Sequence, residues 1–510
     1  MAMTDTRVWL WAPPASALTF AVFHIWFAWI GFVQSDDLYY AVTAEAWAES
    51  GPTLAVTHWG LRHTIVLPTA ALFAAFGAGE DQLMATAVLY AAALLGFAYV
   101  CTDRVGGPVA ASIAVTCMIA VPMMASGASF LTADMPEAVY MIGSVVAFHY
   151  AWRSPRPWLF LFAGALAGVA AITRETTACL LLFYGLLFAA NYGGNRMNYF
   201  WMVPGFIAVF GADTVVLWAA SGDPLYRFTV TLGGVEAVNS DLLANNRAAE
   251  GFDDTGVLSA PRWLKPIVML LANQQIGPLT WIGIPSMVAV ITSGRDRPHW
   301  RLPRLLALFA ATWFVCTTYV LYNSLYLIPR YQIVSIAIMA MCVGLVLAEV
   351  RPFARRVAAG IALLGVAGAG ILLTGASDRT FMYSEREVVR IAQSTSETVW
   401  TDPASRIGAE WLLKQNDDGS RVVAGIPPPG GLFIYNSRPR RPLPGDWPLR
   451  IAPPDWTIVA ETREPVRPFV PLLKATGLWR FLPDVVIRKL DPEPRMTRLL
   501  RRPADRPMAN

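Results

Sequence analysis

The composition of this 510-residue chain is that of a membrane protein, since 55% of its residues are hydrophobic and only 15% are charged. A mean hydropathy of +0.44 excludes a soluble globular protein. The formal net charge of +4 is small and comes from basic residues in short loops, so we expect no nucleic-acid partner. Lysine is nearly absent, so recognition of an anion at the membrane falls mainly to arginine.

The first apolar run, residues 14–33, has about the twenty positions that a bilayer-spanning helix needs. No small-residue cleavage site follows it, so we expect it to stay as a transmembrane helix rather than to be removed as a signal peptide. His24 within it should hydrogen-bond a neighbouring helix. Asp36 and Asp37 come directly after the run, where the predicted helix emerges from the membrane. As an alternative to a functional role, the two acids only mark the end of a helix in water.

Residues 38–80 are polar at first, and their later part, 64–76, is apolar for about half the length of a span. This pattern favours a helix that lies along the membrane interface. Further apolar runs bring the predicted number of spans to about eleven. The predicted spans are 14–33, 82–101, 107–125, 136–152, 158–172, 176–191, 199–220, 276–293, 304–321, 328–349 and 354–374.

Arginines gather in alternate loops between these spans, which predicts that those loops and the N-terminus lie in the cytoplasm. They are Arg104, Arg153, Arg156, Arg196, Arg295, Arg297, Arg301, Arg304, Arg351, Arg355 and Arg356. The opposite loops, 34–81, 126–136 and 221–275, then face the periplasm of a bacterial inner membrane, together with the turn at Arg174 and Glu175. The unusual polar residues therefore converge on the outer face.

The composition changes after residue 375, where prolines and arginines accumulate and apolar runs shorten. We predict a membrane domain over 1–375 and a small periplasmic α/β domain over 376–510, with a flexible tail from about 492. Its expected elements are a helix at 403–415 and strands at 421–425, 456–460 and 484–488. The five cysteines lie in or beside apolar runs without metal-site spacing, which indicates packing residues.

Three features of this arrangement resemble the GT-C superfamily of membrane glycosyltransferases. They are the acidic pair after the first span, a second acid, Asp134, in Leu131-Thr132-Ala133-Asp134-Met135-Pro136, and Arg330-Tyr331 at the start of a late span. The chain is similar to the bacterial members related to protein O-mannosyltransferases and to the lipid A aminoarabinose transferase. The likeness covers residues 1 to about 375.

The resemblance implies a polytopic α-helical fold and transfer of a sugar from a polyprenyl-phosphate carrier to a lipid, glycan or protein acceptor, with inversion at the anomeric carbon. Asp36 matches the first acidic position of the family and is the expected general base. Asp37 stands where relatives more often carry glutamate. Asp134 matches the second acid and is expected to orient the acceptor or, with Asp36, to hold a divalent cation, the one cofactor left open. A helix-capping role is the alternative for Asp134.

Arg62, Arg174 and Arg330 are expected to bind the donor phosphate, because a guanidinium grips phosphate through two parallel hydrogen bonds. Tyr331, His58 and Glu175 are assigned to substrate binding. An ion pair between the neighbours Arg174 and Glu175, and a structural role for His58, remain open. A transporter or flippase of a lipid-linked saccharide is the alternative function. The predicted charged residues lie at span ends on one face of the membrane, which favours a reaction at the surface over transport.

Overall fold

The computed structural model describes residues 5–154, 156–233, 263–293, 297–320, 329–350, 353–377, 380–416, 418–439, 443–445, 447–467, 469–482 and 484–504. The chain divides into two compact units. The membrane unit comprises Met1–Trp29, Tyr39–Gly77 and Gln82–Thr374, and the C-terminal unit comprises Ile30–Leu38, Ala78–Asp81 and Gly375–Asn510. Two short pieces near the N-terminus thus pack with the last third of the chain.

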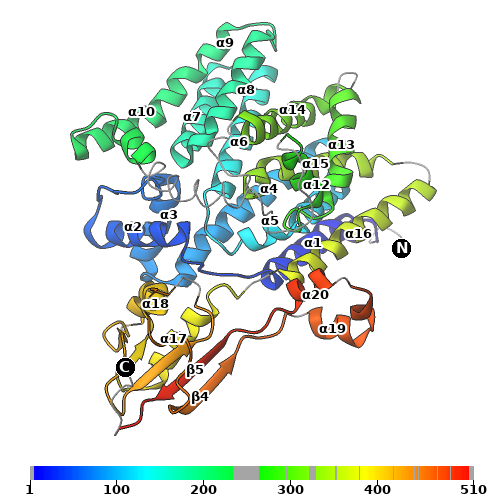
Figure 1. The fold of residues 1–510 in the computed structure, drawn as a ribbon. Coiled ribbons are helices and arrows are strands. Elements are labelled where there is room, and N and C mark those ends of the chain that lie inside the picture. The colour runs from blue at the N-terminus through cyan, green and yellow to red at the C-terminus, as the bar shows by residue number, and fades with distance from the viewer. Residues whose placement is uncertain are drawn as a thin grey trace. The chain divides into compact units, whose positions relative to one another are not determined.

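Helices build the membrane unit (Figure 1). They are α1 (Asp5–Phe27), α2 (Asp36–Ser50), α3 (His63–Phe76), α4 (Glu80–Ile119), α5 (Pro122–Gly127), α6 (Asp134–Arg153), α7 (Pro157–Thr173), α8 (Ala178–Ala189), α9 (Met197–Phe200), α10 (Met202–Ser221), α12 (Lys265–Ala272), α13 (Leu279–Ser293), α14 (Arg301–Val315), α15 (Ile333–Ala348) and α16 (Phe353–Ala376), with short turns η1 (Glu175–Thr177), η2 (Pro298–Trp300), the π-helix η3 (Cys316–Val320) and η4 (Pro329–Gln332).

Each predicted apolar run contains a helix in its described part, because a segment in lipid must satisfy its backbone hydrogen bonds internally. Five helical stretches of the described chain are long and apolar enough to cross a membrane; they are Glu80–Ile119, Met197–Ser221, Pro298–Val320, Pro329–Ala348 and Phe353–Ala376. The predicted half-length run at 64–76 is α3. The first helix differs from its predicted range 14–33, since α1 begins at Asp5 and ends at Phe27.

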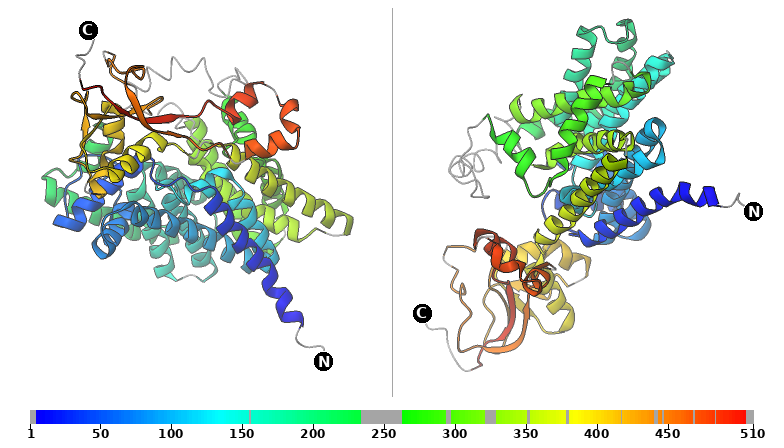
Figure 2. Two further views of the ribbon diagram at one scale, coloured as in Figure 1. Left: turned by 90° about the horizontal axis from the view of Figure 1, so that it is seen from below. Right: turned by 90° about the vertical axis from the view of Figure 1, so that its right-hand side faces the viewer.

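Glycines allow a close helix contact in the membrane unit between α7 and α10, which lie side by side (Figure 2). A Cβ atom on Gly205 would lie 1.9 Å from the carbonyl oxygen of Leu161, and one on Gly164 would lie 1.9 Å from that of Met202. Small residues let two helix backbones touch. In α4, Gly107 has a φ of 79° and precedes Pro108, so the helix breaks between the two runs predicted there.

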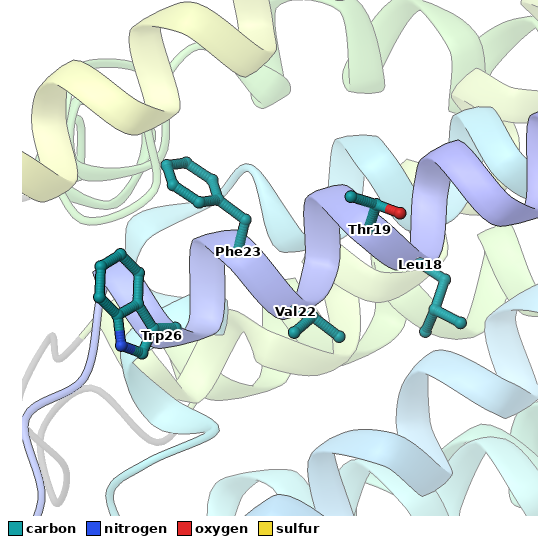
Figure 3. Close-up of a pocket in the computed structure, with 5 residues that line it drawn as sticks. All are labelled: Leu18, Thr19, Val22, Phe23 and Trp26. Atoms are coloured by element: carbon teal, nitrogen blue, oxygen red, sulfur yellow. The ribbon is translucent and has the colours of Figure 1, made fainter.

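Buried side chains tie α1 to the rest of the membrane unit. His24 hydrogen-bonds with Thr374 Oγ1 of α16 at 3.0 Å, which confirms the predicted interhelical bond. The five cysteines are all buried thiols without disulfides, as expected of packing residues. The exposed face of α1 forms a shallow pocket of about 480 Å³ lined by Leu18, Thr19, Val22, Phe23 and Trp26 (Figure 3). Such an apolar lining suits contact with lipid rather than chemistry.

The C-terminal unit contains a five-stranded sheet in the order β2-β1-β3-β5-β4. Its strands are β1 (Val399–Thr401), β2 (Val422–Ala424), β3 (Leu432–Asn436), β4 (Thr457–Arg463) and β5 (Met496–Arg501). The strand β1 pairs in parallel with β2 and β3, whereas β5 pairs antiparallel with β3 and β4. The helices of this unit are α17 (Tyr383–Ser394), α18 (Pro403–Gln415), α19 (Phe469–Ala475), η5 (Leu478–Phe481) and α20 (Asp484–Leu490).

Most predicted elements of this unit are confirmed, and two predictions are wrong. The helix at 403–415 is α18, and the strands at 421–425 and 456–460 overlap β2 and β4. The predicted strand at 484–488 is helix α20 instead. The predicted flexible tail from about 492 contains β5, which sits between β3 and β4 in the sheet; only residues beyond 504 lie outside the described range.

The segment from Ile30 to Leu38 packs into the C-terminal unit through both ring and polar contacts. The Phe32 ring lies against Trp411 with centroids 4.6 Å apart. Gln34 Nε2 donates to the Ile407 carbonyl at 2.8 Å. Glu80 receives two hydrogen bonds from Arg386, at 2.9 and 2.5 Å, and accepts one from the Phe32 amide at 2.9 Å. The early chain is therefore an integral part of this unit.

Candidate active site

Asp37 folds the short loop in front of α2 around its own carboxylate. Its Oδ2 accepts from the Val33 amide at 2.6 Å, and its Oδ1 accepts from the amides of Ser35 at 2.6 Å and Leu38 at 3.0 Å. Complete burial raises the pKa of Asp37 to about 6, although the three backbone donors act against that rise. This geometry gives Asp37 an anchoring role, whereas the neighbouring Asp36 is half-buried at the first position of α2.

The membrane unit contains a buried cluster of acids and arginines around Asp134. Asp134 opens α6, and its Oδ1 accepts from Arg174 Nη1. Arg330 Nε lies 3.6 Å from Asp134 Oδ2, and Thr132 also hydrogen-bonds the carboxylate. The N-cap position of α6 is occupied by Ala133, and Asp134 is the first residue of the helix.

The guanidinium of Arg174 contacts carboxylates at its edge and an aromatic ring on its face. It ends α7, and besides Asp134 its Nη1 lies 3.7 Å from Glu137 Oε2. Its guanidinium lies over the Tyr331 ring, 4.2 Å from the centroid. Glu137 in turn accepts from Thr176 Oγ1. Arg174 therefore pairs with acids of α6, and the sequence-based alternative of a pair with its neighbour Glu175 does not describe the geometry.

Three segments far apart in the sequence build this cluster. The start of α6 supplies the acids, the turn after α7 supplies Arg174, and η4 supplies Arg330 and Tyr331. The backbone of η4 is fixed because Trp313 Nε1 donates to the Tyr331 carbonyl at 2.8 Å. Next to it, Gln332 Nε2 donates to Thr317 Oγ1 at 3.1 Å, in the π-helix at the end of α14. Such π-helical turns are frequent at functional sites.

Arg62 and Glu175 belong to the surroundings of the cluster. Arg62 is buried and donates from Nη1 to the Tyr40 hydroxyl at 2.5 Å. Its charge interacts with the carboxylates of Glu137 and Glu175. Glu175 also accepts from Thr231 Oγ1 at 3.3 Å and interacts electrostatically with His58. Arg62 and Glu175 thus connect the α2–α3 region to the buried cluster.

His58 lies between α2 and α3 and belongs to a stack of three aromatic rings. Its ring centroid is 3.8 Å from that of Trp59, whose other neighbour, Tyr39, stacks at 4.4 Å with an interplanar angle of 7°. All three side chains are partly exposed. Aromatic faces of this kind suit contact with a sugar ring or with the interface of a membrane.

A second charged network was not anticipated from the sequence. Asp213 in α10 accepts from His63 Nδ1 at 2.6 Å and from Arg227 Nε and Nη2 at 3.0 and 2.8 Å. Arg227 also donates to the Leu61 carbonyl at 2.7 Å, and the Tyr226 hydroxyl donates to that of Ala55 at 3.0 Å. The network fastens the loop before α3. The available signal was the single acid within the apolar run 199–220, since an acid in such a run is normally paired.

The structure thus brings four of the nine predicted site residues into direct contact: Asp134, Arg174, Arg330 and Tyr331. Arg62 interacts electrostatically with Glu137, a neighbour of Arg174, and Glu175 interacts with Arg62 and His58. Asp36 and Asp37 belong to the C-terminal unit. Within the described ranges, no group of three or more His, Cys, Asp or Glu side chains could hold a metal ion. Of the two arginines in this cluster, Arg330 is the more exposed, with 27% of its side chain accessible against 9% for Arg174.

Comparisons with known proteins bear on the fold. A family model described as dolichyl-phosphate-mannose-protein mannosyltransferase matches residues 65–218, the stretch that carries Asp134 and Arg174. The chain is similar in structure to ArnT from Cupriavidus metallidurans bound to undecaprenyl phosphate, with a TM-score of 0.53 and 15% identity over 84% of this chain and 93% of that one. The chain has the GT-C fold.

The apo state of the same ArnT gives an equal TM-score of 0.53 at 16% identity, again over 84% of this GT-C chain and 93% of ArnT. The oligosaccharyltransferase of Archaeoglobus fulgidus, in complex with zinc and sulfate, aligns at a TM-score of 0.48 and 13% identity, over 80% of this chain and 63% of that one. No curated protein matches the sequence. The resemblance in fold stated from the sequence is confirmed, and this fold is that of a multi-pass membrane protein.

Proposed function

We propose that this GT-C protein transfers a sugar from a polyprenyl-phosphate carrier to a lipid, glycan or protein acceptor at the periplasmic face of a bacterial inner membrane. The observation that supports this most is the buried cluster in which Asp134, Arg174, Arg330 and Tyr331 meet. It occurs on a fold shared with a protein whose structure is described with bound undecaprenyl phosphate.

The reaction needs a base for the acceptor and cations for the leaving group. The acceptor oxygen bonds to the anomeric carbon from the face opposite the phosphate, and the bond between that carbon and the phosphate oxygen breaks. The acceptor proton passes to a carboxylate, for which we propose Asp36, and the lipid phosphate leaves with its added negative charge, which arginines stabilise. Asp36 and Tyr40 are four residues apart in α2, so their side chains lie on the same face of the helix.

The arginines divide into two roles. Arg330 is the most exposed cation of the cluster, so we propose it as the principal ligand of the donor phosphate, assisted by Arg62. Arg174 is buried between two carboxylates and a ring. We therefore propose that Arg174 positions Asp134 and Tyr331, and that this role takes precedence over direct phosphate binding.

The test is a transfer assay with the purified full-length protein in liposomes. A panel of radiolabelled polyprenyl-phosphate sugars is offered together with membrane extract, and the labelled product is identified after extraction. We expect label to move from the carrier to a second molecule, and to remain on the carrier with Asp36→Asn. The exposed acid Asp81 provides a matched control, Asp81→Asn, that should leave transfer intact.

The same liposomes distinguish the transporter alternative. A flippase would move intact donor between the leaflets, which a membrane-impermeant chemical probe of the sugar detects, while releasing no free polyprenyl phosphate. Movement of intact donor without transfer to any component of the extract would contradict the proposed function.

A further inference from the structure

Residues 466–490 of the C-terminal unit, here called the 466–490 segment, combine exposed apolar side chains with basic ones. Val466, Leu472, Leu478 and Phe481 are all more than half exposed, and Phe481 reaches 79%. Soluble surfaces rarely gather so many large apolar side chains in one short stretch, and such a patch marks a contact with a partner or a membrane. The segment forms α19, η5 and α20.

The start of the segment packs against the end of a membrane-crossing helix. α16, which ends at Ala376, is one of the described helices long and apolar enough to span a bilayer. Arg467 Nη1 donates to the Ala376 carbonyl at 2.5 Å, and the Phe469 ring occupies the space beside Gly375, where a Cβ atom would lie 1.9 Å from Phe469 Cδ2. The segment therefore begins beside the last residues of α16.

The charges of the segment match an anionic surface. It contains five basic residues and one acid: Arg467, Lys474, Arg480, Arg488 and Lys489 against Asp484. Lys474 pairs with Asp491, just past the segment, at 2.6 Å, so the excess of positive charge comes from the arginines and Lys489. The side chains of Arg480 and Arg488 are exposed. Lys474 Nζ lies 5.0 Å from the Trp479 ring centroid, which places an aromatic ring and an ammonium side by side, as at membrane interfaces.

We propose that the 466–490 segment docks on the lipid bilayer beside the end of α16, with Leu478 and Phe481 in the acyl boundary and the basic side chains among anionic headgroups. An interfacial helix binds in this way through apolar area together with attraction to anionic lipid. A protein partner would also cover apolar residues, but the direct contact with the end of a span and the excess of positive charge favour the bilayer.

The test measures the depth of a spin label in the full-length protein. Phe481→Cys is labelled with a nitroxide in nanodiscs that contain anionic lipid, and its collision with oxygen, which partitions into lipid, is compared with its collision with a water-soluble nickel complex. The native cysteines are buried and should not react. Ile451, which is 81% exposed in the same unit but outside the segment, provides the matched label site Ile451→Cys.

We expect the label at 481 to collide with oxygen several-fold more readily, relative to nickel, than the label at 451. Adding Arg480→Gln and Arg488→Gln should reduce that ratio toward the value at 451, as should replacement of anionic by zwitterionic lipid. Equal nickel access at the two sites would overturn the proposal. Protection of residue 481 from both collision partners would also overturn it, because a protein surface would then cover the segment.

Discussion

Asp36 and Asp37 are neighbours in the sequence whose surroundings separate their roles. The carboxylate of Asp37 is fully buried and accepts three backbone hydrogen bonds, so it is committed to the loop. Asp36 is half-buried at the first turn of α2. A residue that anchors backbone affects stability when it is replaced, whereas a residue that accepts a substrate proton affects turnover.

Asp36→Asn should therefore lower turnover by about two to four orders of magnitude, because asparagine keeps the shape but cannot take a proton. Protein level and donor binding should persist. The measurement is sugar transfer at saturating donor, with Asp81→Asn as the control. Near-normal turnover of folded Asp36→Asn, beside an inactive Asp134→Asn, would move the base to Asp134.

Stability should depend on pH through Asp37. Burial raises its pKa to about 6 from an ordinary 3.8, so the folded state holds this proton more tightly than the unfolded state. The resulting stabilisation, on the order of 3 kcal/mol, is complete below about pH 4 and is lost as pH rises through about 6. Melting temperatures between pH 4 and 7 should show this fall in the native chain and a flatter profile in Asp37→Asn. Parallel profiles would exclude Asp37 as the source.

Arg330 and Arg174 should respond differently to substitution. Arg330→Ala should weaken donor binding, since it removes a cation that faces the phosphate. Arg174→Lys keeps the charge but loses the planar contact with Tyr331 and the paired geometry with Asp134, so it should lower kcat while donor affinity stays close to normal. Titration of a donor analogue alongside steady-state kinetics separates the two effects. A loss of donor affinity in Arg174→Lys as large as in Arg330→Ala would make Arg174 a phosphate ligand.

The sequence was enough to predict which residues belong to the cluster, but not which of them pair with each other. Arginine and acid at span ends on one face suggested phosphate chemistry, and three of those residues do meet, beside Tyr331. Arg174, however, pairs with Asp134, 40 residues away, rather than with the adjacent Glu175, because the packing of α6 beside α7 decides which side chains face each other. A pairing of that kind depends on tertiary structure and leaves no local signal.

Elements set by hydropathy were predicted best, and elements set by long-range pairing were predicted worst. Apolar runs such as 158–172 and 354–374 correspond closely to α7 and α16, since a lipid environment requires helix there. Residues 484–488 are short and β-branched, a pattern that local preference cannot assign securely, and they form α20. The strand β5 lies in a polar stretch and exists because β3 and β4 offer it hydrogen bonds on both sides.

The contact of α7 with α10 gives a prediction about a whole element. Gly205→Leu should destabilise the membrane unit by at least about 1–3 kcal/mol, because its side chain would enter the backbone of α7 at Leu161. Gly185→Leu is the control, since nothing lies within 4 Å of the added Cβ position at Gly185 in α8. Thermal unfolding in detergent should show a lower melting temperature for Gly205→Leu alone. Equal melting temperatures would mean that α7 and α10 are not in backbone contact.

At the scale of the whole molecule, the arginine-rich loops predict the side of each connection. Reporter fusions after residues 153 and 296 should be cytoplasmic, and a fusion after residue 400 should be periplasmic. Alkaline phosphatase and a fluorescent protein that folds only in the cytoplasm provide opposite signals at each point. A cytoplasmic signal at 400 would mean that the run 64–76 crosses the membrane, and the proposed outer site would move to the other face.

The C-terminal unit includes residues 30–38 and 78–81 as well as everything after Gly375. Those early residues belong to its interior and surface, because Phe32 packs against Trp411 and Glu80 pairs with Arg386. The two units therefore cannot be inherited as separate modules. A chimera that joins the first 374 residues of this chain to the C-terminal part of a relative would mismatch these contacts unless both short pieces were exchanged as well, so recombination should preserve the three segments together.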